Sequence, residues 1–413
     1  MSPLILKNIM HILVFNGGSS SLSYKIFNYQ DPCNVDVIFR GKAYRVGVKG
    51  MKASYIENHF KGKAEKEVLP IPDHITATSL AADYIKKNDI KVDAIGHRFV
   101  HGGEYFKRSA LIDRTSLKKL ERCLPLAPLH NPISLNVIKE AKRLFPEVPQ
   151  YAVIDSAFHA SIPPKAYTYP LPGKIIKRYK YRRYGFHGIS YSYICRRVPE
   201  FLKKKPKELN MIVCHLGTGG ASVTAVKGGH SVDTSMGSSP NSGLIMSTRS
   251  GDIDPMIIPY LMRTNNYSPQ KVEDLLNKKS GLLGISGFSS DITDIIARRH
   301  DEWFGKRAQL AYEMYVHRLK SYIGSYVMVL SGQIDALVFT DDIGVNNPLI
   351  RESVCDSLHW AGIVIDRSKN QKAPKDRPAL IQSSSSVAAI VTMPTEEELM
   401  ICLEGGRLLG GQK

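Results

Sequence analysis

Apolar runs and alternating apolar–polar segments follow one another along this chain in a mixed order. Short apolar or alternating runs are typical of strands, whereas longer runs with apolar residues three or four positions apart are typical of helices. Strands are predicted at 12–15, directly after residue 21, and at 35–39, 44–48, 92–95, 151–154, 211–216, 222–226, 230–232 and 336–340. Helices are predicted at 76–87, 116–123, 134–144 and 309–330. The pattern predicts an α/β fold.

The order of elements in the first half of the chain recurs in the second. The strand at 12–15 runs into Gly17-Gly18, and the strand at 211–216 runs into Gly217-Thr218-Gly219-Gly220. Each glycine turn opens an antiparallel meander, and helices follow. We interpret this as an internal duplication, in which two halves face one another across a cleft with a glycine turn on each wall.

The bulk composition is that of an ordinary globular protein. The chain has 413 residues, 43% hydrophobic and 23% charged, and no apolar run reaches the roughly 20 residues needed to cross a bilayer. Lys7 and His11 interrupt the apolar start, so no signal peptide is predicted and residues 1–9 are interpreted as an extension. Six cysteines without a C-x-x-C pair argue against zinc and disulfides, and favour a reducing, cytoplasmic location.

The net charge is strongly positive, at +18. A nucleic-acid-binding protein would concentrate such charge among aromatic residues. Here the charge lies in short clusters at 174–183, 203–207 and 369–375, and only the first includes tyrosines, Tyr179 and Tyr181. We therefore favour a basic surface that attracts anionic substrates over a nucleic-acid or membrane partner.

The first glycine turn, Asn16 to Ser21, is a candidate anion site. Its glycines let a ligand approach the backbone closely, and hydroxyls such as those of Ser19 and Ser21 surround free backbone N–H groups. It is not a P-loop, which needs Gly-Lys-Ser/Thr at the start of a helix. By itself this segment is more often a simple turn.

Several other segments carry candidate chemistry, each with a structural alternative. Arg98 lies between His97 and His101 at a strand end, and a salt bridge would also explain it. His130 lies in a proline-bracketed loop, where a packed or capping role is the alternative. Asp155 follows a strand, which is a common site position in α/β folds but also suits a helix N-cap.

Further candidates lie in the second half. Glycines flank His187, which indicates close backbone approach. The segments 233–237 and 247–255 are densely polar, and 394–399 is acidic, as the first turn of a helix would be. No Ser-His-Asp spacing, metal-ligand cluster or dinucleotide fingerprint is present. Arg, His, Asp and Glu around two phosphate-type turns favour phosphoryl transfer, in which the protein mainly positions groups and neutralises charge.

Eight ordered motifs give the chain a specific resemblance to the acetate kinases, from about residue 11 to 406. They are Asn-x-Gly-Ser-Ser-Ser, Gly-His-Arg-x-Val-His-Gly-Gly, Ala-Pro-Leu-His-Asn-Pro, Phe-His-Gly, Cys-His-Leu-Gly, Asp-Thr-Ser-Met-Gly, Thr-Arg-Ser-Gly-Asp-Ile-Asp-Pro and Pro-Thr-x-Glu-Glu-Leu. The resemblance implies the acetate and sugar kinase/Hsp70/actin (ribonuclease H-like) fold, with two duplicated domains around a central cleft, and a homodimer. The domains would be residues 1–156 with 398–413, and residues 157–397.

The resemblance also implies roles for the matching residues. Asn16 and Glu397 would help to hold Mg²⁺. Arg98 and Arg249 would clamp the carboxylate and the phosphoryl group, His187 would stabilise the phosphoryl oxygens, and Asp155 would position or polarise the acetate site. The implied acetate methyl pocket is Val100, Leu129, Phe186 and Pro240. The implied phosphate-contacting residues are Ser19, Ser21, His130, His215, Gly217, Thr218 and Gly219.

Four positions depart from the usual family pattern, and we assign all four to the nucleotide half. Ser23 replaces a lysine, with Lys25 two positions later; Thr218 replaces an asparagine; Thr293 replaces an arginine; and Asp341-Asp342 replace two glycines of the adenosine motif. The aspartates add bulk and negative charge, and they strain the chain if either position has a positive φ. The acetyl and phosphoryl motifs are intact.

This selective change resembles the pyrophosphate-dependent acetate kinases of amoebal type. It predicts exchange of a phosphoryl group between acetyl phosphate and orthophosphate, with acetate and diphosphate as products, or the reverse. One alternative is an ATP-dependent acetate or propionate kinase with a rebuilt adenosine pocket. A second is a non-catalytic, actin-like binding protein, which the intact Arg98, Asp155, His187, Arg249 and Glu397 disfavour.

Overall fold

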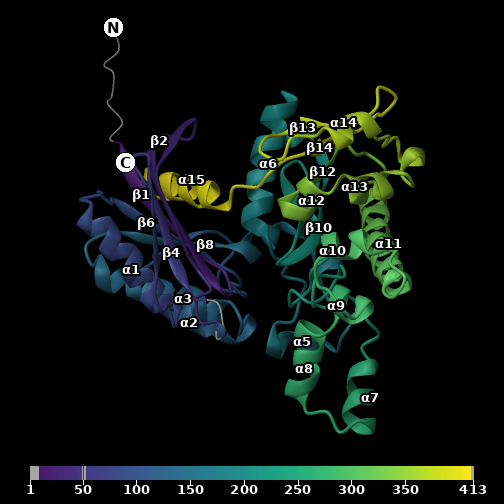
Figure 1. The fold of residues 1–413 in the computed structure, drawn as a ribbon, viewed down its shortest axis with the longest axis horizontal. Coiled ribbons are helices and arrows are strands. Elements are labelled where there is room, and N and C mark those ends of the chain that lie inside the picture. Colours follow the sequence, from purple (N-terminus) through teal and green to yellow (C-terminus); the bar gives the residue numbers. More distant parts are fainter. Residues whose placement is uncertain (1–8, 49, 51–52, 411–413) are drawn as a thin grey trace. The chain divides into compact units, whose positions relative to one another are not determined.

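The computed structural model describes residues 9–48, 50 and 53–410, so residues 1–8 of the predicted extension lie outside the described residues. The chain divides into two compact units. The first contains the described residues up to Phe158 and from Glu396 onward, and the second contains His159–Thr395 (Figure 1). The sequence placed this division after residue 156 and before residue 398.

The first unit contains an eight-stranded sheet in the order β5-β4-β3-β2-β1-β6-β8-β7. Its strands are β1 Met10–Gly17, β2 Ser21–Asp31, β3 Asn34–Tyr44, β4 Tyr55–Phe60, β5 Lys63–Val68, β6 Ala94–Phe99, β7 Ala110–Leu111 and β8 Gln150–Ile154. Strands β6 and β8 run parallel to β1. The strand predicted at 44–48 is wrong: β3 ends at Tyr44, and a turn follows in which Arg45 and Gly47 have positive φ values of 58° and 69°.

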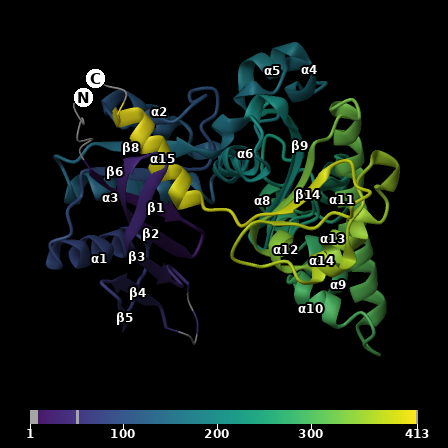
Figure 2. The ribbon, with the colours of Figure 1, turned by 90° about the horizontal axis from the view of Figure 1, so that it is seen from above.

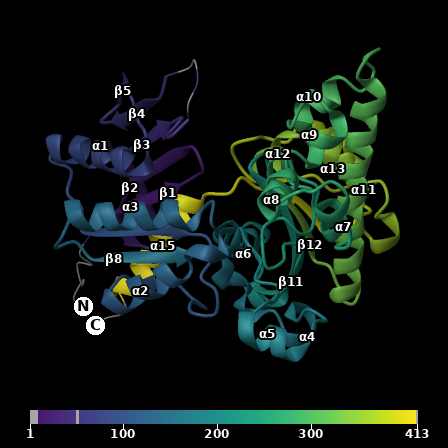
Figure 3. The same ribbon diagram turned by 90° about the horizontal axis from the view of Figure 1, so that it is seen from below.

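Helices cover both faces of this sheet. Helices α1 (His74–Lys87) and α3 (Asn131–Leu144) pack their alanine, valine and isoleucine side chains against the buried residues of β1 and β2. Helix α15 (Glu397–Gly410) packs on the opposite face, as Figures 2 and 3 show from the two sides. Helix α2 spans Arg114–Arg122. Because α15 comes from the end of the chain, it brings C-terminal residues to strand β1.

The second unit contains a six-stranded sheet in the order β11-β10-β9-β12-β14-β13. Its strands are β9 Asn210–Gly217, β10 Gly220–Lys227, β11 His230–Thr234, β12 Ala336–Thr340, β13 Ala379–Leu380 and β14 Ala389–Thr392. Strands β12 and β14 run parallel to β9. The order β11-β10-β9-β12-β14 repeats the order β3-β2-β1-β6-β8 of the first unit, which is the topology that a duplication produces.

Most helices of the second unit are short. They are α4 Pro164–Tyr167, α5 Gly173–Tyr179, α6 Gly188–Leu202, α7 Ile257–Thr264, α8 Pro269–Lys278, α9 Gly281–Ser286, α10 Ile292–Ala297, α11 Gly305–Val329, α12 Asp341–Asn346, α13 Pro348–Cys355 and α14 Arg367–Gln371. Of these, only α11 was predicted. Within the described residues, no helix combines the length and apolarity needed to cross a membrane. All six cysteines are free thiols.

Candidate functional site

The first unit gathers three predicted site residues at one edge of its sheet. Asn16 lies near the end of β1, Arg98 near the end of β6, and Asp155 directly after β8. Because β1, β6 and β8 are parallel neighbours, their carboxyl ends meet at the same edge, where ligands commonly bind in α/β folds. The first turn of α15 adds Glu397 and Glu398. We call these five residues the carboxylate–arginine cluster.

Arg98 is the centre of this cluster. Its Nε and Nη2 donate to Oδ2 of the fully buried Asp155 at 3.0 and 2.8 Å. Its Nη1 lies 3.3 Å from both Oδ1 of Asn16 and Oε2 of Glu397. Burial acts to lower the pKa of Arg98, but the charges of Asp155 and Glu397 outweigh burial and raise that pKa above its ordinary value. Arg98 is therefore a permanent cation in a fixed orientation.

The cluster supplies oxygen ligands of the kind that Mg²⁺ prefers. The Nδ2 of Asn16 donates to Oε2 of Glu397 at 3.1 Å and to Oε1 of Glu398 at 3.4 Å, so the amide and two carboxylates already converge. The described part of the chain contains no set of three or more His, Cys, Asp and Glu side chains arranged as a metal centre. A small number of protein oxygens is nevertheless what Mg²⁺ requires when substrate phosphates and water complete its shell.

Ser23 and Lys25 contact this cluster from the first unit, whereas the departures at 218, 293 and 341–342 lie in the second unit. Both lie on β2 in the first unit, and Nζ of Lys25 lies 3.6 Å from Oε2 of Glu398. Burial acts to raise the pKa of Glu398, but Lys25 and hydrogen bonds, including one from Ser23, lower it below its ordinary value. Lys25 thus partly neutralises the negative charge of Glu398 on α15.

The turn between β1 and β2 is a hairpin tip, as predicted. Ser19 is exposed and Ser21 is half-buried, and the N–H of Gly18 donates to the carbonyl of Ser21 at 2.9 Å. The Nε2 of His74, at the start of α1, lies 2.9 Å from the carbonyl of Gly18. His74 thus fixes the tip from a distant helix, and sequence reasoning missed it because it belongs to none of the motifs.

The remaining predicted residues of the first unit differ in how deeply they are buried. Val100 is buried, Leu129 is exposed, and His130 is half-buried as the residue before α3. His97 is buried, and its Nε2 lies 2.9 Å from Oε1 of Gln150. Burial lowers the pKa of His97 to about 4, so it is a neutral structural residue. His101 is also fully buried.

The second unit contains a pair of stacked histidines. The rings of His187 and His215 lie 4.1 Å apart between centroids, at 30° to one another. The Nδ1 of His187 lies 2.8 Å from Oγ of Ser222, and Nδ1 of His215 lies 2.9 Å from Oγ of Ser190. His187 precedes α6 with a positive φ of 59°. Two serines therefore fix the orientation of both rings.

Arg249 lies close to His187, above Gly220. A Cβ atom on Gly220 would lie 3.2 Å from Nη1 of Arg249 and 3.4 Å from Nε2 of His187, so both groups converge over this glycine. Burial lowers the pKa of Arg249, but arginine, with an ordinary pKa above ~12, remains charged at neutral pH. Cation and imidazole can therefore contact one anionic group together. We call His187, His215, Arg249 and Gly220 the histidine–arginine cluster.

Two aspartates at the start of α12 contact the turn after β9. The Oδ2 of Asp341 lies 3.1 Å from Nε2 of His215. It would lie only 2.1 Å from a Cβ atom on Gly217, so the carboxylate occupies the space that this glycine leaves. The Oδ1 and Oδ2 of Asp342 accept from the backbone N–H and hydroxyl of Thr218 at 2.8 and 2.6 Å. The departures at 218, 341 and 342 are therefore physically connected.

Asp341 also has the strained backbone that the sequence raised as a possibility. Its φ of 66° lies in the left-handed region, which glycine adopts far more readily. Arg351, a fully buried residue of α13, donates from Nη1 to the carbonyls of Gly344 and Val345 in α12. Its Nε donates to Oδ1 of Asn370 at 2.7 Å. This arginine caps the helix that carries both aspartates.

Several polar groups of the two densely polar segments make hydrogen bonds within the second unit. In the segment 233–237, the hydroxyls of Thr234 and Thr224 bond one another, and Oγ of Ser235 accepts from the N–H of Val223. In 247–255, Oγ1 of Thr248 donates to the carbonyl of Asn277. Three hydroxyls of these segments are therefore used in internal hydrogen bonds, whereas Arg249 of the segment 247–255 belongs to the histidine–arginine cluster. Gly185, with φ of 74°, allows close approach of the His159 ring.

Phe186 and Pro240, the second-unit residues of the expected methyl pocket, differ in exposure. Phe186 is buried, whereas Pro240 is half-buried in the loop after β11. Thr293 lies in the first turn of α10, where Asp291 accepts from its N–H at 2.7 Å. Threonine there supplies no cation in place of the usual arginine.

Duplicated α/β units with this strand order have the acetate and sugar kinase/Hsp70/actin fold, and the half-buried arginines, the histidines and the carboxylate–amide oxygen set that they carry suit a phosphotransferase. The sequence model of the acetokinase family matches residues 11–403, and the chain belongs to this family. The family transfers phosphoryl groups with a carboxyl group as acceptor.

Relatives of known name cover nearly the whole chain. The acetate kinase of Thermotoga maritima is 44% identical over 402 residues, 95% of this chain and 97% of that protein. The crystal structure of acetate kinase from Entamoeba histolytica is 39% identical, with a TM-score of 0.87, over 96% of this chain and 99% of that one. A propionate kinase structure from Francisella tularensis is 36% identical, with a TM-score of 0.87, over 96% and 99%.

Proposed function

We propose that this protein transfers a phosphoryl group between acetyl phosphate and orthophosphate, with acetate and diphosphate as the other pair. The observation that carries the proposal is the position of Asp341. Its carboxylate lies in the space beside Gly217 and contacts His215, at the place where the family's adenosine motif has glycine.

Electrostatics favour a small acceptor over a nucleotide. Asp341 and Asp342 place two negative charges at the start of α12, beside the glycine turn after β9. A nucleotide laid against this backbone would meet both carboxylates and would find no bare glycine at 341. Orthophosphate needs only a cation and hydrogen-bond donors, which Arg249 and His187 supply.

Each residue of the two clusters has a role set by its contacts. Arg98 neutralises the substrate carboxylate, and Asp155 is a positioning residue because two N–H groups of Arg98 donate to one of its oxygens. Arg249 and His187 stabilise the transferring phosphoryl group, where charge spreads over the equatorial oxygens. The acetate methyl group contacts Val100, Leu129, Phe186 and Pro240. The phosphate groups contact His130, His215, Ser19, Ser21, Gly217, Thr218 and Gly219.

The reaction balances as a direct in-line transfer. An oxygen of orthophosphate attacks phosphorus, and the bond between phosphorus and the acyl oxygen breaks, with the electron pair leaving on acetate. The dianions of acetyl phosphate and orthophosphate give acetate and a diphosphate trianion, so no net proton is released. Acetate is a poor nucleophile in the reverse direction, and the arginines reduce its repulsion from diphosphate.

Asn16 and Glu397 are the residues that would hold Mg²⁺. A bound Mg²⁺ supplies charge neutralisation for the phosphate oxygens.

We further propose a homodimer located in the cytoplasm. The six free thiols fit a reducing compartment. Helix α7 has no buried residue, and Met256, Ile257 and Tyr260 are 60%, 45% and 60% exposed, which is an apolar face suited to a second copy. Light scattering should give the mass of two chains, and the variant Tyr260→Asp should give one. A monomeric wild type would contradict the dimer.

The phosphoryl acceptor is tested by incubating the protein with acetyl phosphate and Mg²⁺. Orthophosphate is added in one reaction and ADP in another, and acetyl phosphate loss and diphosphate formation are measured. The proposal is supported if acetyl phosphate is lost in the presence of orthophosphate and an equal amount of diphosphate is formed. Loss only with ADP overturns it in favour of an ATP-dependent kinase, and loss with neither favours a non-catalytic protein.

A further inference from the structure

A pocket outside both clusters lies on the first unit's sheet, on the face opposite α1. It has a volume of about 230 Å³ and is lined by strands β2, β3 and β4. The lining residues that carry its chemistry are Ser23, Lys25, Arg40, Lys42, Glu57 and His59. We call it the outer-face pocket.

Strand register explains why cations gather there. Lys25 pairs with Arg40, and Arg40 pairs with His59, so these three residues form one row across the sheet. The next row on the same face is Ser23, Lys42 and Glu57. Because alternate residues of a strand point to one face, two lysines and one arginine share this face with one carboxylate of the sheet, Glu57, and Lys25 also contacts Glu398 of α15.

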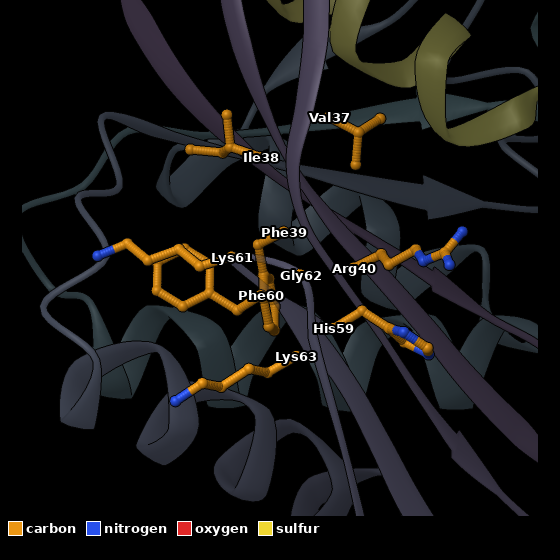
Figure 4. Close-up of a pocket in the computed structure, with 9 residues that line it drawn as sticks. All are labelled: Val37, Ile38, Phe39, Arg40, His59, Phe60, Lys61, Gly62 and Lys63. Carbon is orange, nitrogen blue, oxygen red and sulfur yellow. The ribbon is translucent and has the colours of Figure 1, made fainter.

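The carboxylate does not neutralise the pocket. The Oε1 of Glu57 lies 2.8 Å from Nε2 of His59, so it is already paired within the lining. An adjoining pocket of about 380 Å³ shares Arg40 and His59. Figure 4 shows the nitrogen ends of these two side chains on one side of that pocket, with the amines of Lys61 and Lys63 on the other. The adjoining pocket therefore also carries cationic side chains, Arg40, Lys61 and Lys63.

Two lining residues also contact the carboxylate–arginine cluster. Nζ of Lys25 lies 3.6 Å from Oε2 of Glu398, and the hydroxyl of Ser23 is a further hydrogen-bond partner of Glu398. Oε1 of Glu398 in turn accepts from Nδ2 of Asn16 at 3.4 Å. A ligand that took Lys25 and Ser23 would therefore remove two partners of Glu398.

We propose that the outer-face pocket binds a small phosphate monoester that carries hydroxyl groups, and that this ligand lowers the phosphoryl-transfer rate. Arg40, Lys42 and Lys25 bind the phosphate, since guanidinium and ammonium groups are its strongest partners in proteins. Glu57 and Ser23 accept from the hydroxyls. The effect on rate rests on the proposed role of Asn16, whereas the binding itself does not depend on the phosphoryl acceptor.

The test uses glycerol 3-phosphate as the probe and glycerol as its phosphate-free counterpart. Binding is measured by isothermal titration, and the rate by acetyl phosphate loss. We expect glycerol 3-phosphate to bind and to inhibit, and glycerol to do neither. Absence of binding, or equal binding of glycerol, overturns the proposal.

The double variant Arg40→Gln/Lys42→Gln locates the site. It should retain the basal rate and bind glycerol 3-phosphate at least about tenfold more weakly, as loss of two charge-assisted contacts predicts. The control Lys118→Gln/Arg122→Gln removes the same charges from the exposed surface of α2 and should bind like the wild type. If Arg40→Gln/Lys42→Gln binds glycerol 3-phosphate as tightly as the wild type, or if the control loses as much affinity, the ligand does not bind in the outer-face pocket. Binding without inhibition overturns the connection through Lys25.

Discussion

The carboxylate of Asp341 contacts the imidazole of His215, with Oδ2 and Nε2 3.1 Å apart, although 126 positions separate the two residues in the chain (341 − 215). This contact joins the start of α12 to the turn after β9. It places a negative charge beside the stacked histidines, and the proposed acceptor preference follows from it.

The double variant Asp341→Gly/Asp342→Gly should change the acceptor. We expect the rate with orthophosphate to fall about tenfold, because the turn after β9 loses the partners of His215 and Thr218. Acetyl phosphate loss with ADP should rise above the wild-type level. Both rates are measured by acetyl phosphate loss at saturating acceptor.

Asp89→Gly is the matched control for that variant. Asp89 also has a positive φ, of 51°, but it lies in the first unit after α1. At 89 and at 341 the folding free energy should change by no more than about 1 kcal/mol, since glycine relieves the positive φ but raises the entropy of the unfolded chain. An acceptor shift in Asp89→Gly, or none in the double variant, would refute the role of the aspartates.

Asp155→Asn should lower kcat about 100-fold, because a neutral amide no longer holds Arg98 in its orientation. The variant should also lose about 3 kcal/mol of stability, since it leaves a buried cation without its main counter-charge. Steady-state kinetics and thermal unfolding measure the two effects. Glu140→Gln, which breaks the peripheral pair with Arg143, is the control and should leave kcat unchanged. A kcat near wild type in Asp155→Asn would contradict the positioning role.

Ser222→Ala should reduce kcat about tenfold with little change in KM, because the Nδ1 of His187 loses its partner and the ring its orientation. Ser222→Thr, which restores a hydroxyl, should recover part of the loss. Ser161→Ala removes a hydroxyl that bonds the carbonyl of Ser231 and serves as the control. If kcat is equal in Ser222→Ala and Ser161→Ala, His187 does not depend on Ser222.

The buried His97 predicts acid sensitivity of the first unit. Its pKa of about 4 in the folded protein lies below the ordinary 6.5, so between these values the unfolded chain binds the additional proton. The stabilisation is complete above pH 6.5 and decreases as the pH falls towards 4, by up to about 3 kcal/mol. Thermal unfolding of the wild type at pH 7 and pH 5 measures the loss.

His97→Gln should be less stable than the wild type at pH 7 but should lose less stability between pH 7 and pH 5. His59→Gln, at the sheet surface, should retain the wild-type dependence. An unchanged dependence in His97→Gln would show that other groups cause the acid sensitivity.

The apolar pattern predicted most of the central strands, although it missed the buried strand β14, and it missed most peripheral elements. The strands at 12–15, 211–216 and 336–340 were found because they are buried apolar runs, and all three are confirmed. Strand β5 was missed because all six of its residues are exposed, so no hydrophobic period marks it. The short helices α4, α5, α7, α9 and α10 have too few turns to show a helical period, whereas α6, with 15 residues, was missed despite its length.

The site was predictable as motifs but not as contacts. Arg98 and Asp155 were identified separately, and only the parallel order of β6 and β8 brings them together. The pairing of Thr218 with Asp342 is equally invisible in sequence, because each residue was seen as an independent departure. The contact of Lys25 with Glu398 could not be predicted either, since Glu398 comes from the other end of the chain.

The buried guanidinium of Arg351 has a consequence for how substrate preference can change among relatives of this protein. The guanidinium of Arg351 donates to the carbonyls of Gly344 and Val345. These hydrogen bonds fix the backbone of α12 and do not involve the side chains at 341 and 342. Exchange of those two side chains, with a compensating change at 218, then leaves the main chain in place. A lineage could therefore pass from one phosphoryl acceptor to another through a few point mutations, without an intermediate that fails to fold.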